Sequence, residues 1–331
     1  MKAFIKAAAV ACGIVAGTVG SAAAQTTLKF SHHFPNNPND FRSLLGLAFA
    51  DELSKANVGL TVTIYPDQSL VRAKEQWEAL SRGTIDLSAF SMAELAGPAE
   101  FQVLGMPAVI KDRDHAKRLE ASPFMGALKA LSEKSGVVIL DSLWLVGAIG
   151  SAKGCIERPD DLVGLAARTS SKALDQVFES AGALTVAMPS SELSKGLTTG
   201  AIDALTLPAA TMATMKMHDQ LKCVTLPGAG ALNYVHLPIM VSKVTWDKLT
   251  PDQQTAAGAA AAKAAQASLE LVLKAEKQVA EDYAKAGATI KTLDTANFAA
   301  WRALAEKTAW TSFEKMSPEA GELMRLMKAI D

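Results

Sequence analysis

Two stretches of this chain, 27–90 and 164–207, share one order of strands and helices, and this repeat limits the possible folds more than any other feature. The pattern Leu-x-x-Gly-x-Ile-Asp occurs at 80–86 and again at 197–203, and Leu-Thr-Val occurs at 60–62 and at 184–186. Apolar periodicity and turn residues predict strand, helix, strand, helix, strand in each stretch. Because the helices act as crossovers, the strands should be mostly parallel, and we expect two α/β lobes.

The ends of the expected strands point to a common cleft. The first copy should contain strands at 28–33, 60–65 and 85–90, with helices at 40–56 and 73–81. The second should contain a strand that ends at Arg168, helices at 171–180 and 191–197, and strands at 184–186 and 202–207. Ligands of such sheets bind outside the carboxyl ends of strands. If the lobes face each other, the strand ends at 32–33, 88–91, 168–171 and 206–208 share one cleft.

Arg168 is the most informative residue at these strand ends. It closes the apolar run 162–167 and precedes Thr169, Ser170 and Ser171 at the start of a helix. A guanidinium beside hydroxyls and free helix N–H groups is suited to hold an anion. Local sequence alone leaves open the alternative that Arg168 is simply exposed at a strand end, as most arginines are.

The N-terminus has the features of a secretory signal peptide. Lys2 and Lys6 precede an apolar segment at 7–19, and the small residues at 22–24 predict cleavage between Ala24 and Gln25. No later stretch has the ~20 uninterrupted apolar residues of a membrane helix. The whole chain has 33 basic and 34 acidic residues, so removal of the two lysines leaves 31 against 34. Without a basic run, binding to nucleic acid or to an anionic membrane is not indicated.

Two cysteines remain after the signal peptide, Cys155 and Cys223. An exported protein can form disulfides, and an even number of cysteines favours one bridge between them. Each cysteine borders the second copy of the repeat, so the two can meet at its base. The alternative is a pair of buried free thiols.

A long helix is expected after the capping box Thr250-Pro251-Asp252-Gln253. It should continue to about residue 286, a length of about 54 Å, which exceeds one lobe. We therefore expect it to brace both lobes. The tail at 295–330 predicts two more helices with Trp301 and Trp310 in the core. The expected division is 25–146 plus 233–270 in lobe I and 147–232 plus 271–331 in lobe II.

Several motifs together resemble one transport family over 27–325. They are Pro159-x-Asp161-Leu162-x-Gly164-Leu165-x-x-Arg168, Met188-Pro189-x-x-Glu192-Leu193, Gly200-x-Ile202-Asp203, Pro208, Gly83-Thr84-Ile85-Asp86 and the long helix. The chain is similar to the periplasmic solute-binding proteins of tripartite ATP-independent periplasmic (TRAP) transporters, in the dicarboxylate-binding-subunit (DctP) family.

This resemblance implies an α/β, two-lobe periplasmic binding protein fold with mixed sheets, hinge strands and the bracing helix. It also implies a small organic acid as ligand and a TRAP membrane permease with small and large subunits as partner. No cofactor and no metal are expected, and we expect a monomer. The family's arginine that pairs with the ligand carboxylate matches Arg168.

Three departures from the family pattern suggest the kind of ligand. Many members carry a second arginine where this chain has Ala148, an asparagine where it has Leu207, and an aromatic residue where it has Ser190. These changes remove a charge and an amide, so we expect a monocarboxylate with an apolar or aromatic part. Other residues expected near the ligand are Ser171, Trp144, His33, Ser88, Phe90, Asn233 and His236. Trp144 can serve instead as ordinary core packing.

Other classes of function fit the sequence less well. The chain has five histidines, and the adjacent His32 and His33 on a strand point to opposite faces, so they cannot chelate one metal there. The sequence contains no HExxH, paired CxxC or GxSxG motif that would indicate an enzyme. Met212, Met215, Met217 and His218 offer a copper site, but methionines at such spacing are more often core residues. A binding protein for an ATP-driven importer and a ligand-presenting protein for a sensor remain as alternatives.

Overall fold

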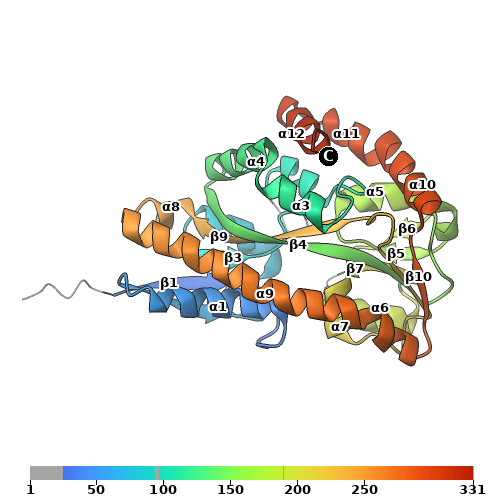
Figure 1. Cartoon of the computed structure of the whole chain (residues 1–331), viewed down its shortest axis with the longest axis horizontal. Helices are drawn as coiled ribbons and strands as arrows, with labels where there is room; N and C mark the ends of the chain where they lie inside the picture. The colour runs from blue at the N-terminus through green and yellow to red at the C-terminus, as the bar shows by residue number, and fades with distance from the viewer. Residues whose placement is uncertain (1–24, 94–96, 189, 331) are drawn as a thin grey trace, which may run out of the picture.

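The computed structural model describes residues 25–93, 97–188 and 190–330. The expected signal peptide at 1–24 with its cleavage site, Pro189 of the Met-Pro motif, and the last residue of the chain lie outside these ranges. In the described residues the strands form one mixed sheet in the order β2-β1-β3-β9-β4-β7-β5-β6, and β8 joins β4 to β10 (Figure 1).

The two copies of the repeat have the same topology. The first contains β1 (Thr26–Ser31), α1 (Phe41–Lys55), β2 (Leu60–Tyr65), α2 (Gln76–Ser81) and β3 (Leu87–Ala89). The second contains β5 (Ala166–Arg168), α5 (Lys172–Ser180), β6 (Leu184–Thr185), α6 (Leu193–Thr199) and β7 (Ala204–Pro208). In each copy the first strand pairs in parallel with the other two. The repeat is therefore confirmed, and every expected strand and helix of it is present within a few residues.

Two equivalent aspartates explain the shared Gly-x-Ile-Asp motif. The carboxylate of Asp86 accepts a hydrogen bond from the backbone N–H of Lys29 at 2.8 Å, and the N–H of Asp86 donates to the Lys29 carbonyl at 3.1 Å. Asp203 makes the same two bonds with Ala166, at 3.1 and 2.7 Å. Each aspartate thus sets the register between the first and third strands of its copy. The glycine three residues earlier has a positive φ of 73° in both copies, a conformation that favours glycine.

Strand β4 (Val137–Ser151) connects the two parts of the sheet. From Val137 to Val146 it pairs antiparallel with β9 (Tyr234–Ser242), and from Gly147 to Ser151 it pairs with β7 and, near its end, with β8 (Cys223–Leu226). A Cβ atom on Gly147 would collide with the Asn233 side chain, which explains the glycine there. In the sequence, the apolar run Val-Val-Ile-Leu at 137–140 predicts only the beginning of this strand. We propose that the lobes divide where its pairing changes.

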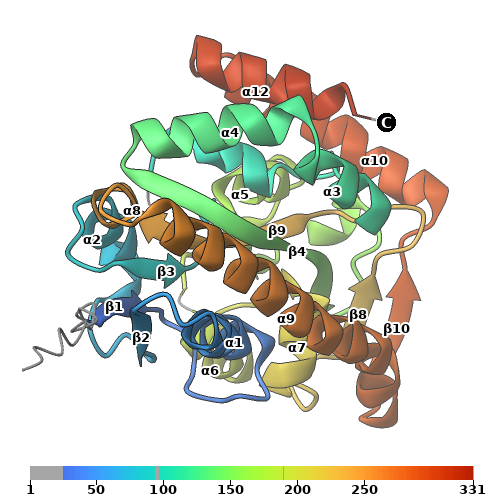
Figure 2. The same cartoon turned by 60° about the vertical axis from the view of Figure 1, so that its left-hand side comes forward.

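Helix α9 (Pro251–Lys285) lies along both parts of the molecule. The side chain of Thr250 and that of Gln253 form the expected capping box at its start. Figures 1 and 2 show α9 running diagonally across the molecule, with α1 against one half and α7 (Ala209–Met215) against the other. Buried alanines on α9 allow this close packing, among them Ala257, Ala260, Ala261 and Ala264. The bracing helix is confirmed.

The remaining helices cover the opposite face of the sheet. They are α3 (Arg113–Glu120), α4 (Pro123–Lys134), α10 (Thr295–Ala305), α11 (Thr311–Glu314) and α12 (Pro318–Lys328), and the short α8 (Lys243–Trp246) and strand β10 (Thr289–Thr292) complete the order. Trp301 and Trp310 are buried, and their indole N–H groups donate to the carbonyls of Glu157 and Pro107. Helix α12 packs on α4, which lies in the expected lobe I, and α10 packs on α5, which lies in the expected lobe II. The C-terminal helices therefore contact residues of both expected lobes.

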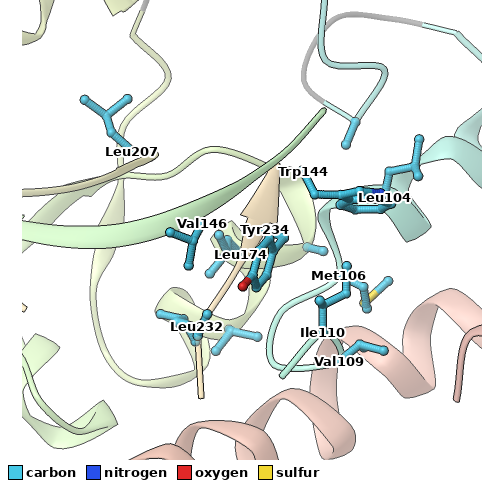
Figure 3. Close-up of a cluster of buried hydrophobic side chains, with 14 of the residues drawn as sticks. Leu104, Met106, Val109, Ile110, Trp144, Val146, Leu174, Leu207, Leu232 and Tyr234 are labelled. Atoms are coloured by element: carbon cyan, nitrogen blue, oxygen red, sulfur yellow. The ribbon is translucent and has the colours of Figure 1, made fainter. Parts of the chain in front are cut away.

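Successive side chains of β4 point to opposite faces of the sheet, and the two faces contribute to two different hydrophobic cores. Leu143 and Leu145 pack in the core under α1 and α9, whereas Trp144 and Val146 pack in the core under α3 and α4. Figure 3 shows Trp144, Val146 and Tyr234 in this second core. Among the described residues no helix combines the length and apolar character needed to cross a membrane.

Cys155 and Cys223 form a disulfide, as the even number of cysteines favoured. Cys223 begins β8, directly opposite Ser151 at the end of β4. The bridge therefore closes the base of the segment that contains the whole second copy of the repeat.

Candidate functional site

A cavity of about 60 Å³ lies where four strand ends meet. The loop after β1 contributes His33, the segment after β3 contributes Ser91, the end of β5 contributes Arg168 and Ser170, and the end of β7 contributes Leu207 and Pro208. This is the arrangement expected of parallel strands in two facing lobes. The other lining residues are Phe34, Arg42, Leu145, Ser190, Thr211, Val235 and Leu237.

Arg168 is buried at this cavity, with 6 % of its surface exposed. Its Nε donates to the carbonyl of Met188 at 3.2 Å, so the loop before α6 helps to orient the guanidinium. The alternative of an exposed arginine at a strand end is excluded by this burial. A buried guanidinium at a cavity wall can form charge-assisted hydrogen bonds with an anion.

A network of polar side chains fixes Ser170 beside Arg168. The Asn233 side-chain amide donates to Ser170 Oγ at 3.0 Å, and the Ser170 backbone N–H donates to Thr206 Oγ1 at 3.0 Å. Ser170 is thereby connected to both β7 and the start of β9. Because its oxygen accepts from Asn233, its own hydroxyl proton can be directed to a ligand.

The structure brings four of the residues named from the sequence to the cavity wall, namely Arg168, His33, Ser190 and Leu207. Asn233 acts on the wall through Ser170. Ser171 instead caps α5 by accepting from the Leu174 N–H, and its hydroxyl donates to the Gly105 carbonyl. Ala148 is buried opposite Leu207 on the neighbouring strand and does not line the cavity.

The other four residues lie away from the cavity. The Ser88 hydroxyl is bonded within the sheet to the Ser31 carbonyl, and Phe90 is buried in the core. Trp144 and His236 point to the opposite face of the sheet from Leu145, Val235 and Leu237, because side chains alternate along a strand. There the Trp144 indole donates to Glu120 at 2.6 Å and its ring lies 4.6 Å from that of His236.

Sequence reasoning missed Arg42, which lines the same cavity from α1. Its Nε donates to Asp40 Oδ1 at 2.8 Å, and its Nη2 donates to Asp40 Oδ2. Asp40 is also the N-cap of α1, where it accepts from the Arg42 backbone N–H. The start of this helix at residue 40 was recognised in the sequence. The arginine two residues later was not, because its contact with the cavity depends on how β1 and α1 fold against the second copy.

His33 is uncharged near neutral pH. Burial, the Arg42 guanidinium and His32 lower the pKa of His33 to about 4. Burial also lowers the pKa of His32 to about 4, although a hydrogen bond with Phe34 and the nearby Asp67 and Asp40 act in the opposite direction. The cavity therefore receives no positive charge from its histidine.

These pKa values predict a loss of stability in mild acid. Because both histidines bind protons more weakly in the folded state, unfolding takes up protons between their ordinary pKa of 6.5 and about 4. The free energy of unfolding should fall as pH decreases through that window, by about 2 kcal/mol for each histidine at pH 5. Urea unfolding at pH 7 and pH 5 measures this. In His32→Phe the fall in the free energy of unfolding between pH 7 and pH 5 should be smaller by about the contribution of one histidine. An unchanged pH dependence in that variant would contradict the assignment.

Comparison with known proteins identifies the family. The family model described as bacterial extracellular solute-binding protein, family 7 (DctP), matches residues 30–316. This chain belongs to that DctP family. It is 31% identical to the C4-dicarboxylate-binding periplasmic protein DctP of Rhodobacter capsulatus. The match extends over 245 residues, which are 72% of this chain and 71% of that protein. A solute-binding protein of Albidiferax ferrireducens is 29% identical over 322 residues, 95% of each chain.

Solved structures of TRAP periplasmic solute binding proteins share the fold. A TRAP periplasmic solute binding protein from Rhodoferax ferrireducens, with bound malonate, superposes with a TM-score of 0.87 at 28% identity, over 92% of this chain and 98% of that one. A TRAP periplasmic solute binding protein from Sulfurospirillum deleyianum, with bound succinate, has a TM-score of 0.78 at 25% identity over 93% of this chain and all of that one. The two-lobe fold expected from the motifs is therefore confirmed.

Nothing in the described part of this DctP-family chain groups three or more His, Cys, Asp or Glu side chains as a metal site would. The side chains at the cavity instead offer the guanidinium of Arg168, the guanidinium of Arg42 paired with Asp40, hydroxyls and an apolar wall. Such a surface can bind and orient an organic anion.

Proposed function

We propose that this protein captures a small organic monocarboxylate and presents it to a TRAP membrane permease. The observation that carries the proposal is the buried guanidinium of Arg168 on the wall of a cavity formed by four strand ends. In a poorly solvated cleft, a bidentate pair between arginine and a carboxylate is favourable and geometrically specific.

The charge on the cavity wall supports a single carboxylate. The charge of Arg42 is offset by Asp40, and His33 is neutral near pH 7, so neither supplies an uncompensated positive charge for a second carboxylate. A ligand whose one carboxylate meets Arg168 suits such a wall. The relatives whose structures hold malonate and succinate bind acids with two carboxyl groups. We propose that this chain differs from them in that respect.

The rest of the wall supports a small ligand with an apolar part. Six of the lining residues are apolar, namely Phe34, Leu145, Leu207, Pro208, Val235 and Leu237. The cavity volume of about 60 Å³ corresponds to roughly four to six water molecules. A short acid with a compact apolar group suits this space better than a sugar acid does.

Membership of a family of extracellular solute-binding proteins supports a binding step outside the cytoplasm. We propose that the signal peptide is cleaved between Ala24 and Gln25, that the mature protein acts in the periplasm as a monomer, and that its partners are the small and large membrane subunits of a TRAP transporter. We propose no catalytic role, cofactor or nucleic-acid partner, because the cavity offers groups for binding and orientation.

A thermal-shift screen of short organic acids tests the proposed ligand class. A ligand at about 100 times its dissociation constant should stabilise the protein by about 2.7 kcal/mol. We expect short monocarboxylates to raise the melting temperature and sugar acids to leave it unchanged. Stabilisation by sugar acids but not by any short monocarboxylate would contradict the proposal.

A further inference from the structure

We propose that Arg42 is a second ligand-binding residue, and that Asp40 makes it select a neutral oxygen on the ligand in preference to a second carboxylate. The ligand class is then a monocarboxylate that also carries a hydroxyl or carbonyl oxygen. This inference rests on the proposed function, because it takes Arg168 as the anchor for the carboxylate.

The guanidinium of Arg42 is held in place before any ligand arrives. Its Nε and Nη2 atoms donate to the two oxygens of Asp40, and its Cζ lies 5.4 Å from the ring centre of Phe34 and 5.8 Å from that of Phe41. The side chains of Arg42 and Asp40 are 13% and 4% exposed. A donor fixed in this way loses little conformational freedom on binding, which favours affinity.

One nitrogen of Arg42 remains for a ligand. Nε and Nη2 are used by Asp40, whereas Nη1 has no hydrogen-bond partner in the ranges that the structure describes. Arginine carries five N–H donors and no acceptor, so this nitrogen can only donate. Since Arg42 lines the cavity, the group that meets it must be a hydrogen-bond acceptor.

Asp40 determines the charge of that acceptor. A second ligand carboxylate would be attracted by Arg42 but repelled by Asp40, whose carboxylate lies 2.8 Å from Arg42 Nε. The two effects largely cancel, and the carboxylate would still lose its hydration. A hydroxyl or carbonyl oxygen loses far less hydration and still accepts the hydrogen bond. The pair of Asp40 and Arg42 therefore distinguishes an oxygen without charge from a carboxylate.

The two arginines come from different copies of the repeat. Arg42 belongs to α1 of the first copy, and Arg168 ends β5 of the second. A ligand that contacts both connects the two lobes. Its carboxylate end faces Arg168 and its neutral oxygen faces Arg42, so the proposal also fixes the orientation of the ligand.

Four three-carbon acids test this inference by calorimetry. Propionate has one carboxylate and no further oxygen, lactate adds a hydroxyl, pyruvate adds a carbonyl, and malonate adds a second carboxylate. Wild-type protein should bind lactate or pyruvate at least tenfold more tightly than propionate and than malonate. If neither lactate nor pyruvate binds more tightly than propionate, or if malonate is preferred to both, the inference is overturned.

Asp40→Asn isolates the contribution of the charge. Asparagine is as good an N-cap as aspartate and its oxygen can still accept from Arg42, so α1 should keep its start. With the negative charge removed, the affinity for malonate relative to lactate should rise at least tenfold. Asp51→Asn is the matched control, because Asp51 lies on the same helix with 64% of its side chain exposed, and it should leave the ratio unchanged.

Arg42→Gln gives a second test if Asp40→Asn does not fold. In this variant the preference for lactate over propionate should disappear, while propionate still binds. Arg168→Ala separates the two proposals. If it binds all four acids as the wild type does, the proposed function fails. If it loses them while Asp40→Asn leaves the ratio of malonate to lactate unchanged, only this inference fails.

Discussion

Replacement of Arg168 with alanine is expected to weaken ligand binding by about 3–5 kcal/mol, a loss of a hundredfold or more in affinity. The guanidinium is 6 % exposed, so the ligand carboxylate would be left in a poorly solvated cavity without its partner. Isothermal titration with the tightest ligand from the thermal-shift screen measures this loss. Arg168→Lys should fall between the wild type and alanine, because lysine keeps the charge but cannot form the planar, bidentate pair.

Two controls separate binding from folding. Arg82→Ala removes an arginine whose side chain is 73% exposed on the first copy, and it should leave the affinity unchanged. Since Arg168 also donates to the Met188 carbonyl, the melting temperature of Arg168→Ala must be measured beside its affinity. A folded Arg168→Ala protein with wild-type affinity would refute the role proposed for this arginine.

Loss of the disulfide should give the second large effect. Cys155 and Cys223 are 68 positions apart, and a bridge that closes such a loop stabilises a protein by about 4 kcal/mol in the chain-entropy model. The double variant Cys155→Ser, Cys223→Ser should therefore unfold at a lower urea concentration. Wild-type protein treated with a reductant should show the same midpoint as the double variant.

Ligand affinity should respond differently from stability in this variant. The bridge lies at the base of the second copy, beside the end of β4, whereas Arg168 lies at the carboxyl end of β5 at the cavity. We expect the folded double variant to bind ligand with nearly the wild-type dissociation constant. A midpoint equal to that of the oxidised wild type would show that the bridge adds nothing to stability.

The sequence was sufficient for features that depend on local patterns. The repeat, the capped helix α9, the tryptophans of the tail and the position of Arg168 at a strand end all follow from periodicity, caps and turn residues. The aspartates at 86 and 203 show why the repeat is visible, since each makes the same pair of backbone hydrogen bonds. Features of this kind require no knowledge of how the two copies face each other.

The sequence was insufficient for features that depend on the direction of a side chain or on packing between segments far apart in the chain. Trp144 and His236 are next to cavity residues along their strands, but one position along a strand reverses the face to which a side chain points. Strand β4 continues past Asp141 and Ser142, polar residues that gave no sign of a strand, because it pairs with β9 and then with β7 and β8. Arg42 reaches the cavity only because α1 of one copy meets the strand ends of the other.

The strand register relates the two halves of the site position by position, but the side chains at corresponding positions differ in their chemistry. Phe30 pairs with Leu87 as Ala167 pairs with Ala204, so Ser31 in the first copy corresponds to Arg168 in the second. By the same count His33 corresponds to Ser170 and Ser91 to Pro208, and all four line the cavity. One scaffold position thus carries a serine in one half and Arg168, the proposed anchor of the ligand, in the other. A ligand with two identical ends cannot use this difference, whereas a ligand with one acidic end and one neutral end matches it.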